Sequence, residues 1–244
     1  MIILSVGMPR AGSGWYYNLT NDLMLANGAQ DARSIRQRYH LQRILTEVNC
    51  NIGALTAGRL MAALVPSFLG NTFVIKAHAG PTPFARFLIG QGWMRTTYIY
   101  RDPRDAMLSA YENGVRARER GRDNAFSHLV DFETALAFMR EYVKISEAWL
   151  ATDKVLHARY ENLLSDYDGE ASQLVDFLKL EKTAPAIQAV VDKYRPAESA
   201  RAEQKGLHFS KGKIGRFRQK MPPEQQEAMA QAFADYLHNC GYAI

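Results

Sequence analysis

Four short runs of apolar and β-branched residues mark the chain, and longer stretches with helical spacing separate them. The runs cover residues 2–7, 72–77, 96–100 and 154–159, and each has the length of a buried strand. The stretches around them predict helices over residues 14–28, 31–48, 54–69, 82–91, 104–119, 126–151, 160–165, 170–179, 184–194 and 223–239. Strands that alternate with helices predict a three-layer α/β fold, in which helices flank a central parallel sheet.

The first predicted strand runs into a glycine-rich turn, Gly7-Met8-Pro9-Arg10-Ala11-Gly12-Ser13-Gly14-Trp15, which leads into a helix. This turn is similar to a P-loop, because glycines let backbone N–H groups converge on an anion and a helix N-terminus favours negative charge. The nucleotide pattern G-x-x-x-x-G-K-[ST] is not satisfied, since Ser13 stands at the position of the lysine. Arg10 is the only cation of the turn. The turn therefore predicts a site for a phosphate-like group other than the triphosphate of ATP or GTP.

The second and third predicted strands also end in polar side chains. Ligands of α/β sheets bind beyond the carboxyl ends of the strands, so His78 and Arg101 are expected near the glycine-rich turn. An imidazole with a pKa near ~6.5 could remove a proton from a hydroxyl, and Lys76 on the same strand face could neutralise a leaving group. Arg101 and Ser109 could hold a second phosphate. The alternatives are a histidine that caps the turn before Pro81 and an arginine that belongs to a helix cap.

Composition narrows the class of protein. The 244 residues suit a single domain over 1–244, and 47% hydrophobic with 23% charged residues is typical of a globular chain. The net charge of +5 fits an anionic ligand. Cys50 and Cys240 lie far apart, which argues against a disulfide framework, and no apolar run reaches the ~20 residues that span a membrane. We therefore expect a cytoplasmic protein without a secretory signal or a membrane span.

A basic segment lies near the C-terminus. Residues 195–220 contain eight Lys or Arg and two Glu. Lys211 and Gly212 lie in its glycine-containing part, which could close over an anionic ligand as a lid. The same segment could instead contact nucleic acid or remain a solvated loop. Because the glycine-rich turn indicates a small phosphate-like ligand, we expect no nucleic-acid partner.

Together these segments resemble the sulfotransferases that use 3′-phosphoadenosine 5′-phosphosulfate (PAPS), in their bacterial, cytosolic form. The family's first motif, approximately P-[KR]-[ST]-G-[ST]-[ST]-W, is matched by residues 9–15. The other matches are a K-T-H-like segment at Lys76-Ala77-His78, the pair Arg101 and Ser109, an R-Y-E-[DN]-L segment at Arg159-Tyr160-Glu161-Asn162-Leu163, and an R-K-G-x-x-G-x-W loop at Ser210-Lys211-Gly212-Lys213-Ile214-Gly215-Arg216-Phe217. Each motif alone is weak, but five motifs in the family's order span most of the chain.

The resemblance implies a donor site made from several of these segments. PAPS would be the sulfuryl donor and 3′-phosphoadenosine 5′-phosphate (PAP) the product, and no metal ion would be needed. The implied contacts are Arg10, Ala11, Gly12, Ser13 and Gly14 at the 5′-phosphosulfate, Trp15 and Tyr160 at the adenine, and Arg101, Ser109, Lys211 and Gly212 at the 3′-phosphate.

The resemblance also implies the chemistry. His78 would deprotonate an acceptor hydroxyl, and Lys76 and Arg10 would stabilise charge on the transferring sulfuryl group and its bridging oxygen during in-line displacement. The acceptor would be a small molecule, a lipid or a carbohydrate, and the protein would be a monomer or a homodimer. The acceptor would contact segments that the motifs do not cover, namely 31–70, 80–95 and 112–128.

The chain departs from the family pattern at several positions. Ala11 and Gly14 stand where the family has hydroxyl residues, and Ser210 stands where it has an arginine. Lys213 or Arg216 could substitute for that arginine. Two alternatives to a sulfotransferase remain: a P-loop kinase that uses ATP, which the missing lysine argues against, and a non-catalytic nucleotide-binding module.

Overall fold

One parallel sheet forms the centre of the protein. The computed structural model describes residues 1–196 and 212–243, and its four-stranded sheet has the order β2-β1-β3-β4. The strands are β1 (Ile2–Gly7), β2 (Phe73–Ala77), β3 (Met94–Tyr100) and β4 (Val155–Arg159). All three pairings are parallel, so the carboxyl ends of the strands meet at one edge. The predicted strands are confirmed to within two residues.

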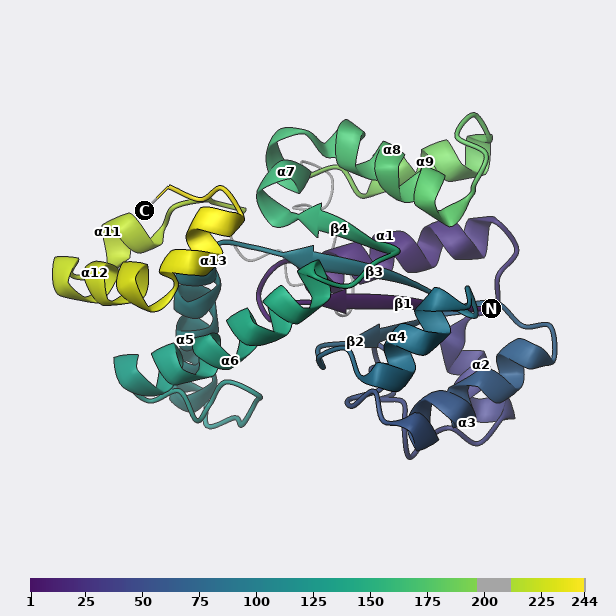
Figure 1. Ribbon diagram of the computed structural model, residues 1–244, viewed down its shortest axis with the longest axis horizontal. Helices are drawn as coiled ribbons and strands as arrows, with labels where there is room; N and C mark the ends of the chain where they lie inside the picture. The colour runs from purple at the N-terminus through teal and green to yellow at the C-terminus, as the bar shows by residue number, and fades with distance from the viewer. Residues whose placement is uncertain (197–211, 244) are drawn as a thin grey trace.

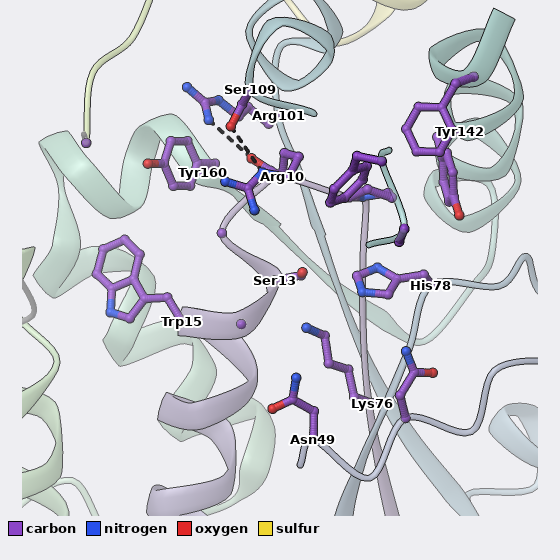
Figure 2. Close-up of a pocket in the computed structure, with 18 of the residues that line it drawn as sticks. Arg10, Ser13, Trp15, Asn49, Lys76, His78, Arg101, Ser109, Tyr142 and Tyr160 are labelled. Atoms are coloured by element: carbon purple, nitrogen blue, oxygen red, sulfur yellow. Dashed lines mark hydrogen bonds between the residues drawn. The ribbon is translucent and has the colours of Figure 1, made fainter. Parts of the chain in front are cut away.

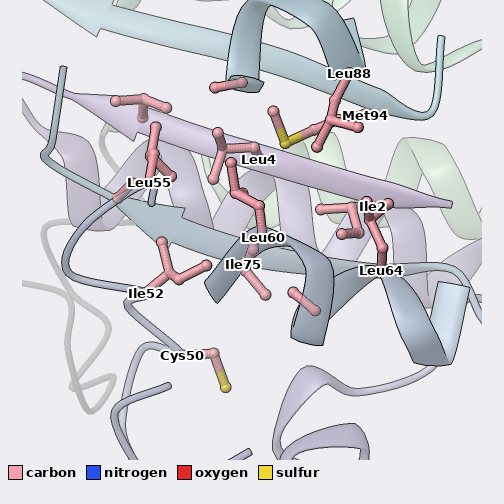
Figure 3. Close-up of a cluster of buried hydrophobic side chains, with 14 of the residues drawn as sticks. Ile2, Leu4, Cys50, Ile52, Leu55, Leu60, Leu64, Ile75, Leu88 and Met94 are labelled. Atoms are coloured by element: carbon pink, nitrogen blue, oxygen red, sulfur yellow. The ribbon is translucent and has the colours of Figure 1, made fainter. Parts of the chain in front are cut away.

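Helices cover both faces of this sheet (Figure 1). Side chains that alternate along the strands supply two separate apolar clusters, because successive residues of a strand point to opposite faces. Ile3, Val74 and Ile99 belong to one cluster, and Leu4 and Ile75 belong to the other (Figure 3). The first cluster packs against α1 (Ser13–Ala26), α8 (Tyr167–Leu178) and α9 (Pro185–Lys193), and the second against α2 (Ala32–Arg38), α3 (Ala57–Phe68) and α4 (Pro83–Gly90). The three-layer α/β fold expected from the sequence is confirmed.

A third apolar cluster lies beyond the carboxyl edge of the sheet. Met8 from the turn after β1 packs there with Met107 and Met139, and with Met229 and Phe233 near the C-terminus. The helices that contribute are α5 (Pro103–Glu119), α6 (Phe132–Leu150), α11 (Phe217–Lys220), α12 (Pro223–Ala232) and α13 (Ala234–Asn239), while α7 (Tyr160–Ser165) follows β4 directly. Across residues 1–196 and 212–243, no helix is both long and apolar enough to cross a membrane.

The helix predicted over residues 31–48 is shorter than its apolar spacing suggested. The α2 helix ends at Arg38, and His40 has a φ of 56°, which interrupts the helical backbone. A single turn follows, in which the N–H of Leu45 donates to the carbonyl of Leu41 at 2.9 Å. Leu41 and Leu45 are buried as the periodicity indicated, although they do not lie on a continuous helix.

Two other helices differ from their predicted bounds. The helix predicted over 126–151 begins only at Phe132, because the side chain of Asp131 accepts a hydrogen bond from the N–H of Thr134 and caps it. The helix predicted over 223–239 divides into α12 and α13 at Phe233, whose φ is −120°. The residues before Phe132 are therefore free to form a loop beside the carboxyl edge of the sheet.

Candidate active site

A pocket of about 380 Å³ lies at the carboxyl edge of the sheet, where parallel α/β sheets bind their ligands. The ends of β1, β2 and β3 and the first residue of α7 all reach it. The residues of the sequence-based site that line it are Arg10, Gly12, Ser13, Gly14, Trp15, Lys76, His78, Arg101, Ser109, Tyr160 and Gly212. Segments that are about 200 residues apart in the sequence therefore meet around one cavity.

The turn after β1 presents the start of a helix to this pocket. Arg10 and Gly12 have φ values of 65° and 75°, so the chain reverses sharply before α1 begins at Ser13. No side chain caps α1, and its first turn contains no acidic residue. Because the first N–H groups of a helix have no acceptor within the helix, this N-terminus is suited to an anion.

Gly12 allows an aromatic ring to pack against the turn. A Cβ at this position would lie 2.7 Å from Cδ2 of Tyr160, which is closer than real side chains approach. The ring of Tyr160 in turn lies under the guanidinium of Arg101, with 4.3 Å between Cζ and the ring centroid. The glycine therefore brings the turn, Tyr160 and Arg101 into one packed unit.

Arg101 is held by carbonyl oxygens on both sides. Its Nη1 donates to the carbonyl of Arg10 at 3.1 Å, and its Nη2 donates to the carbonyl of Lys213 at 3.0 Å. The Nε atom is buried and has no hydrogen-bond partner among the described residues. A buried donor without an acceptor is rare in proteins, and this one belongs to a residue that lines the pocket.

Arg10 lies between the turn and α5. Its Nε donates to Oγ of Ser109 at 3.1 Å, so these two predicted site residues meet directly (Figure 2). Burial, followed by the nearby charges of Arg116 and Arg101, lowers the pKa of Arg10 to about 10. No carboxylate of the described residues lines the pocket itself, whereas Asp105 and Glu112 pair with Arg101 and Arg216 behind its wall.

A backbone carbonyl determines which ring nitrogen of His78 carries the proton. Its Nδ1 lies 2.6 Å from the carbonyl oxygen of Gly7, and a carbonyl can only accept, so Nδ1 carries the hydrogen. Burial, followed by the charge of Lys76, lowers the pKa of His78 to about 4. The ring is therefore neutral at pH 7 and its Nε2 carries a free lone pair.

Lys76 is the second polar side chain from β2. It is 5% exposed, and burial together with the charge of Arg10 lowers its pKa to about 8. At pH 7 its ammonium group remains mostly protonated. Figure 2 shows Lys76 and His78 on the same side of Ser13, with the ammonium directed into the pocket.

Three of the predicted donor contacts need separate comment. The side chain of Ala11 is buried in the third apolar cluster and its N–H donates to the carbonyl of Met8, so Ala11 does not line the pocket. Trp15 lines it, but its Nε1 donates to the carbonyl of Tyr194 and its ring lies parallel to that of Tyr167, 6.1 Å away. Lys211 lies outside the described residues.

An aromatic wall forms the part of the pocket that the sequence motifs did not indicate. Phe126 lies before α6, and Phe138 and Tyr142 lie one turn apart on it. The Phe138 and Tyr142 rings are 4.8 Å apart, and the Phe126 ring meets Phe138 edge-on at 5.9 Å. In Figure 2 Tyr142 lies on the His78 side of the turn, whereas Trp15 lies on the opposite side with Tyr160.

Four further polar residues also line the pocket. Asn49 and Asn51 come from the loop before α3, and Lys213 and Arg216 come from the segment before α11. Residues 31–70 and 112–128 thus reach the cavity as expected, but 80–95 contribute nothing to it. Within the described ranges, no group of His, Cys, Asp or Glu side chains could hold a metal ion.

Solved structures share this fold. Mouse sulfotransferase SULT7A1 complexed with PAP is 15% identical, with 98% of this chain and 85% of that chain covered and a TM-score of 0.62. Retinol dehydratase with retinol and PAP is 16% identical, with 97% and 81% covered and a TM-score of 0.61. Retinol dehydratase with androsterone and inactive cofactor PAP is 17% identical, with 97% and 80% covered and a TM-score of 0.59.

At such identities the likeness shows the fold alone. No curated protein matches the chain in sequence. The family model described as a sulfotransferase domain matches residues 2–241, which is almost the whole chain. The chain therefore belongs to the sulfotransferase domain family.

Proposed function

We propose that this chain, as one domain, transfers a sulfuryl group from PAPS to the hydroxyl of a small acceptor molecule. One observation carries the proposal: cationic side chains from separate parts of the sequence line the pocket, and no carboxylate of the described residues lies among them. A ligand with several negative charges fits such a pocket. A P-loop kinase is not favoured, because the family model describes a sulfotransferase and Ser13 stands where the kinase lysine would be.

The residues fit the two anionic groups of PAPS at separate places. The turn after β1, with Arg10, Ser13, Gly14 and the uncapped start of α1, would hold the 5′-phosphosulfate. Arg101 and Ser109 would hold the 3′-phosphate, and the partnerless Nε of Arg101 supports this assignment. Gly212 lines the same pocket, and a contribution from Lys211 remains a prediction.

The adenine would lie between the turn and the side of the pocket that holds Trp15 and Tyr160. Tyr160 is already covered by Arg101 on one face, and Trp15 is fixed by its hydrogen bond to Tyr194. Both rings are therefore held in place before a ligand enters, which reduces the entropy lost on binding.

His78 would act as the general base. The acceptor oxygen would bond to the sulfur of PAPS as the bond between that sulfur and the bridging oxygen of the 5′-phosphate breaks, which releases PAP. The acceptor hydroxyl must lose its proton in the same step. The neutral ring with a free Nε2 can take that proton. Lys76 and Arg10 would stabilise the negative charge on the sulfuryl group and the bridging oxygen, and they do so by position and charge alone.

The acceptor would have an apolar or aromatic body. The rings of Phe126, Phe138 and Tyr142 line the same pocket as His78, and Figure 2 shows Tyr142 on the His78 side of the turn. A hydroxyl that reaches Nε2 would therefore carry the rest of the molecule against this aromatic wall. The retinol dehydratase structures of the same fold hold retinol or androsterone together with PAP. These observations support a small apolar alcohol over a highly charged acceptor.

Thermal unfolding with nucleotides tests the donor assignment. A ligand that binds only the folded state stabilises it, so saturating PAP should raise the melting temperature by roughly 5–10 °C. The nucleotide 5′-AMP lacks the 3′-phosphate and should raise it much less. In Arg101→Gln the advantage of PAP over 5′-AMP should disappear while the response to 5′-AMP persists. Equal shifts with PAP and 5′-AMP in the unmodified protein would contradict the 3′-phosphate assignment, and no shift with either would contradict PAPS as the donor.

A further inference from the structure

A buried carboxylate lies directly behind the pocket. Asp105 is in the first turn of α5, four residues after Arg101, and its side chain is 1% exposed. Its Oδ2 accepts from the N–H of Gly215 at 2.6 Å, and its Oδ1 accepts from the N–H of Phe217 at 3.1 Å. Oδ2 also lies 3.4 Å from Nη2 of Arg101. One side chain therefore joins Arg101 to a segment that is more than 100 residues away in the sequence.

The segment 212–217 is held at several points by these contacts. Asp105 accepts from Gly215 and Phe217, while Nη2 of Arg101 donates to the carbonyl of Lys213. Between these points the chain turns at Gly215, whose φ is 74°. Gly212, Lys213 and Arg216 line the pocket, so the contacts to Asp105 and Arg101 determine where they lie.

A second carboxylate on α5 holds the side chain of the same segment. Glu112 lies two turns after Asp105, and its Oε1 pairs with Nη2 of Arg216 at 2.5 Å. Asp105 thus bonds the backbone of the segment, and Glu112 bonds its arginine. Hydrogen bonds to a carboxylate are about twice as strong as those to a neutral acceptor, so the side chain of Asp105 is well suited to hold these two backbone amides.

We propose that Asp105 is a positioning residue, which fixes both Arg101 and the segment 212–217 and so assembles the end of the pocket that receives the second phosphate of the donor. This inference rests on the proposed function, because it takes the 3′-phosphate to lie at Arg101. Asp105 does not line the pocket itself. It acts through the guanidinium on one side and through the backbone of Gly215 and Phe217 on the other.

The variant Asp105→Asn keeps the shape of the side chain and removes its charge. One of its two acceptor atoms becomes an NH2 group, which must face a backbone N–H or the guanidinium. We expect PAP to bind on the order of 10- to 100-fold more weakly, while the affinity for 5′-AMP stays within a factor of about two, because only PAP uses this end of the pocket. The KM for PAPS should rise with kcat little changed, since His78 and Lys76 are untouched.

Asp176→Asn is the matched control. It makes the same chemical change on the surface of α8, where Asp176 is 63% exposed and pairs with Lys182. Surface pairs of this kind contribute little, so both nucleotides should bind as they do to the unmodified protein. Equal losses for PAP and 5′-AMP in Asp105→Asn would reduce Asp105 to a general structural role, and unchanged PAP binding would overturn the proposal outright.

A second variant covers the case in which Asp105→Asn does not fold. Gly215→Ala strains the turn at a φ of 74° and places a Cβ 3.1 Å from Nη1 of Arg218, while Asp105 keeps its charge. It should show the same selective loss of PAP affinity, and retained selectivity would overturn the proposal. Failure of the proposed function is recognised separately, because the unmodified protein would then not distinguish PAP from 5′-AMP.

Discussion

At the scale of single residues, the chemistry of the pocket follows from where each charge and proton is held. His78 donates through Nδ1 to a backbone carbonyl, so its Nε2 is the atom left to accept a proton. Lys76 and Arg10 are buried near one another, and each has a lowered pKa because burial and like charges disfavour the cation. A neutral imidazole and two cations therefore line one pocket, an arrangement suited to the transfer of an anionic group.

Replacing His78 by alanine should separate binding from chemistry. His78→Ala removes the proposed base but none of the cations, so PAP should still raise the melting temperature as in the unmodified protein. Turnover with any identified acceptor should fall by about 100-fold or more, which is the usual contribution of a general base. His157→Ala is a control, because His157 bonds the carbonyl of Trp149 and does not line the pocket. Undiminished turnover in His78→Ala would remove His78 from the mechanism.

The lowered pKa of Lys76 predicts an alkaline limit for the free enzyme. Lys76 is cationic below about pH 8 and loses its charge above it, so kcat/KM for PAPS should decline as the pH rises through 8. His78 is neutral above about pH 4, so activity should persist well below pH 6.5. In Lys76→Arg the alkaline decline should move to about pH 10, because the new arginine keeps its charge and Arg10, whose pKa is about 10, then sets the limit. A decline that stays near pH 8 in this variant would assign the limit to another group.

At the scale of elements, α5 organises the pocket through one face. Counting on from Arg101, the residues Asp105, Ser109 and Glu112 follow at spacings of four, four and three. They contact, in order, the segment 212–217, Arg10 and Arg216. This helix thus connects the turn after β1 with the C-terminal part of the chain.

Sequence reasoning found the strand ends and the motifs on them, because a parallel sheet brings the carboxyl ends of its strands together whatever the details of packing. It did not find the aromatic wall, since Phe138 and Tyr142 at a spacing of four look like any buried helix face. The helix predicted over 31–48 was wrong in extent because His40 takes a positive φ, which no pattern of apolar residues indicates. Ala11 was expected to contact the donor because it lies within the first family motif, although it departs from that motif, and its methyl group turns into the core.

A glycine on α5 should control the aromatic wall. A Cβ at Gly114 would collide with the carbonyl oxygen of Phe126, so Gly114→Ala should displace Phe126 from the pocket. The KM for an apolar acceptor should rise several-fold, and the response to PAP should be unchanged. Gly58→Ala is the matched control, because Gly58 lies in α3 with open space around it. That variant should be stabilised by about 0.5–1 kcal/mol and bind its acceptor normally. An unchanged KM for the acceptor in Gly114→Ala would show that Phe126 does not contribute to acceptor binding.

At the scale of the whole molecule, the site reduces the stability of the ligand-free protein. Arg10, Lys76 and His78 all have lowered pKa values, which means that folding disfavours their charged forms. For His78 the loss of stability appears as the pH falls from 6.5 towards 4, because the unfolded chain then binds the proton more readily. An anionic donor offsets this cost when it enters, so binding and stability are linked.

Removing one of these cations should stabilise the empty protein. Arg10→Met keeps much of the apolar volume and the same backbone strain at a φ of 65°, but removes a buried charge next to Arg101 and Lys76. The free energy of unfolding in urea should rise by about 1 kcal/mol, although the bond to Ser109 is lost. The same variant should lose most of its thermal response to PAP. A less stable variant would show that Arg10 contributes more by packing than it costs by its charge.

The carbonyl that orients His78 belongs to Gly7, where a Cβ would lie 2.6 Å from Cγ2 of Ile99 and 2.7 Å from Cβ of Ser13. No side chain fits there, so the peptide plane after β1 cannot rotate to suit one. The tight packing of β1 against β3 and the start of α1 thus determines which ring nitrogen of His78 carries the proton. In evolutionary terms, a residue other than glycine at position 7 would disturb the proposed acid–base chemistry of His78, although Gly7 contributes only its carbonyl oxygen to it.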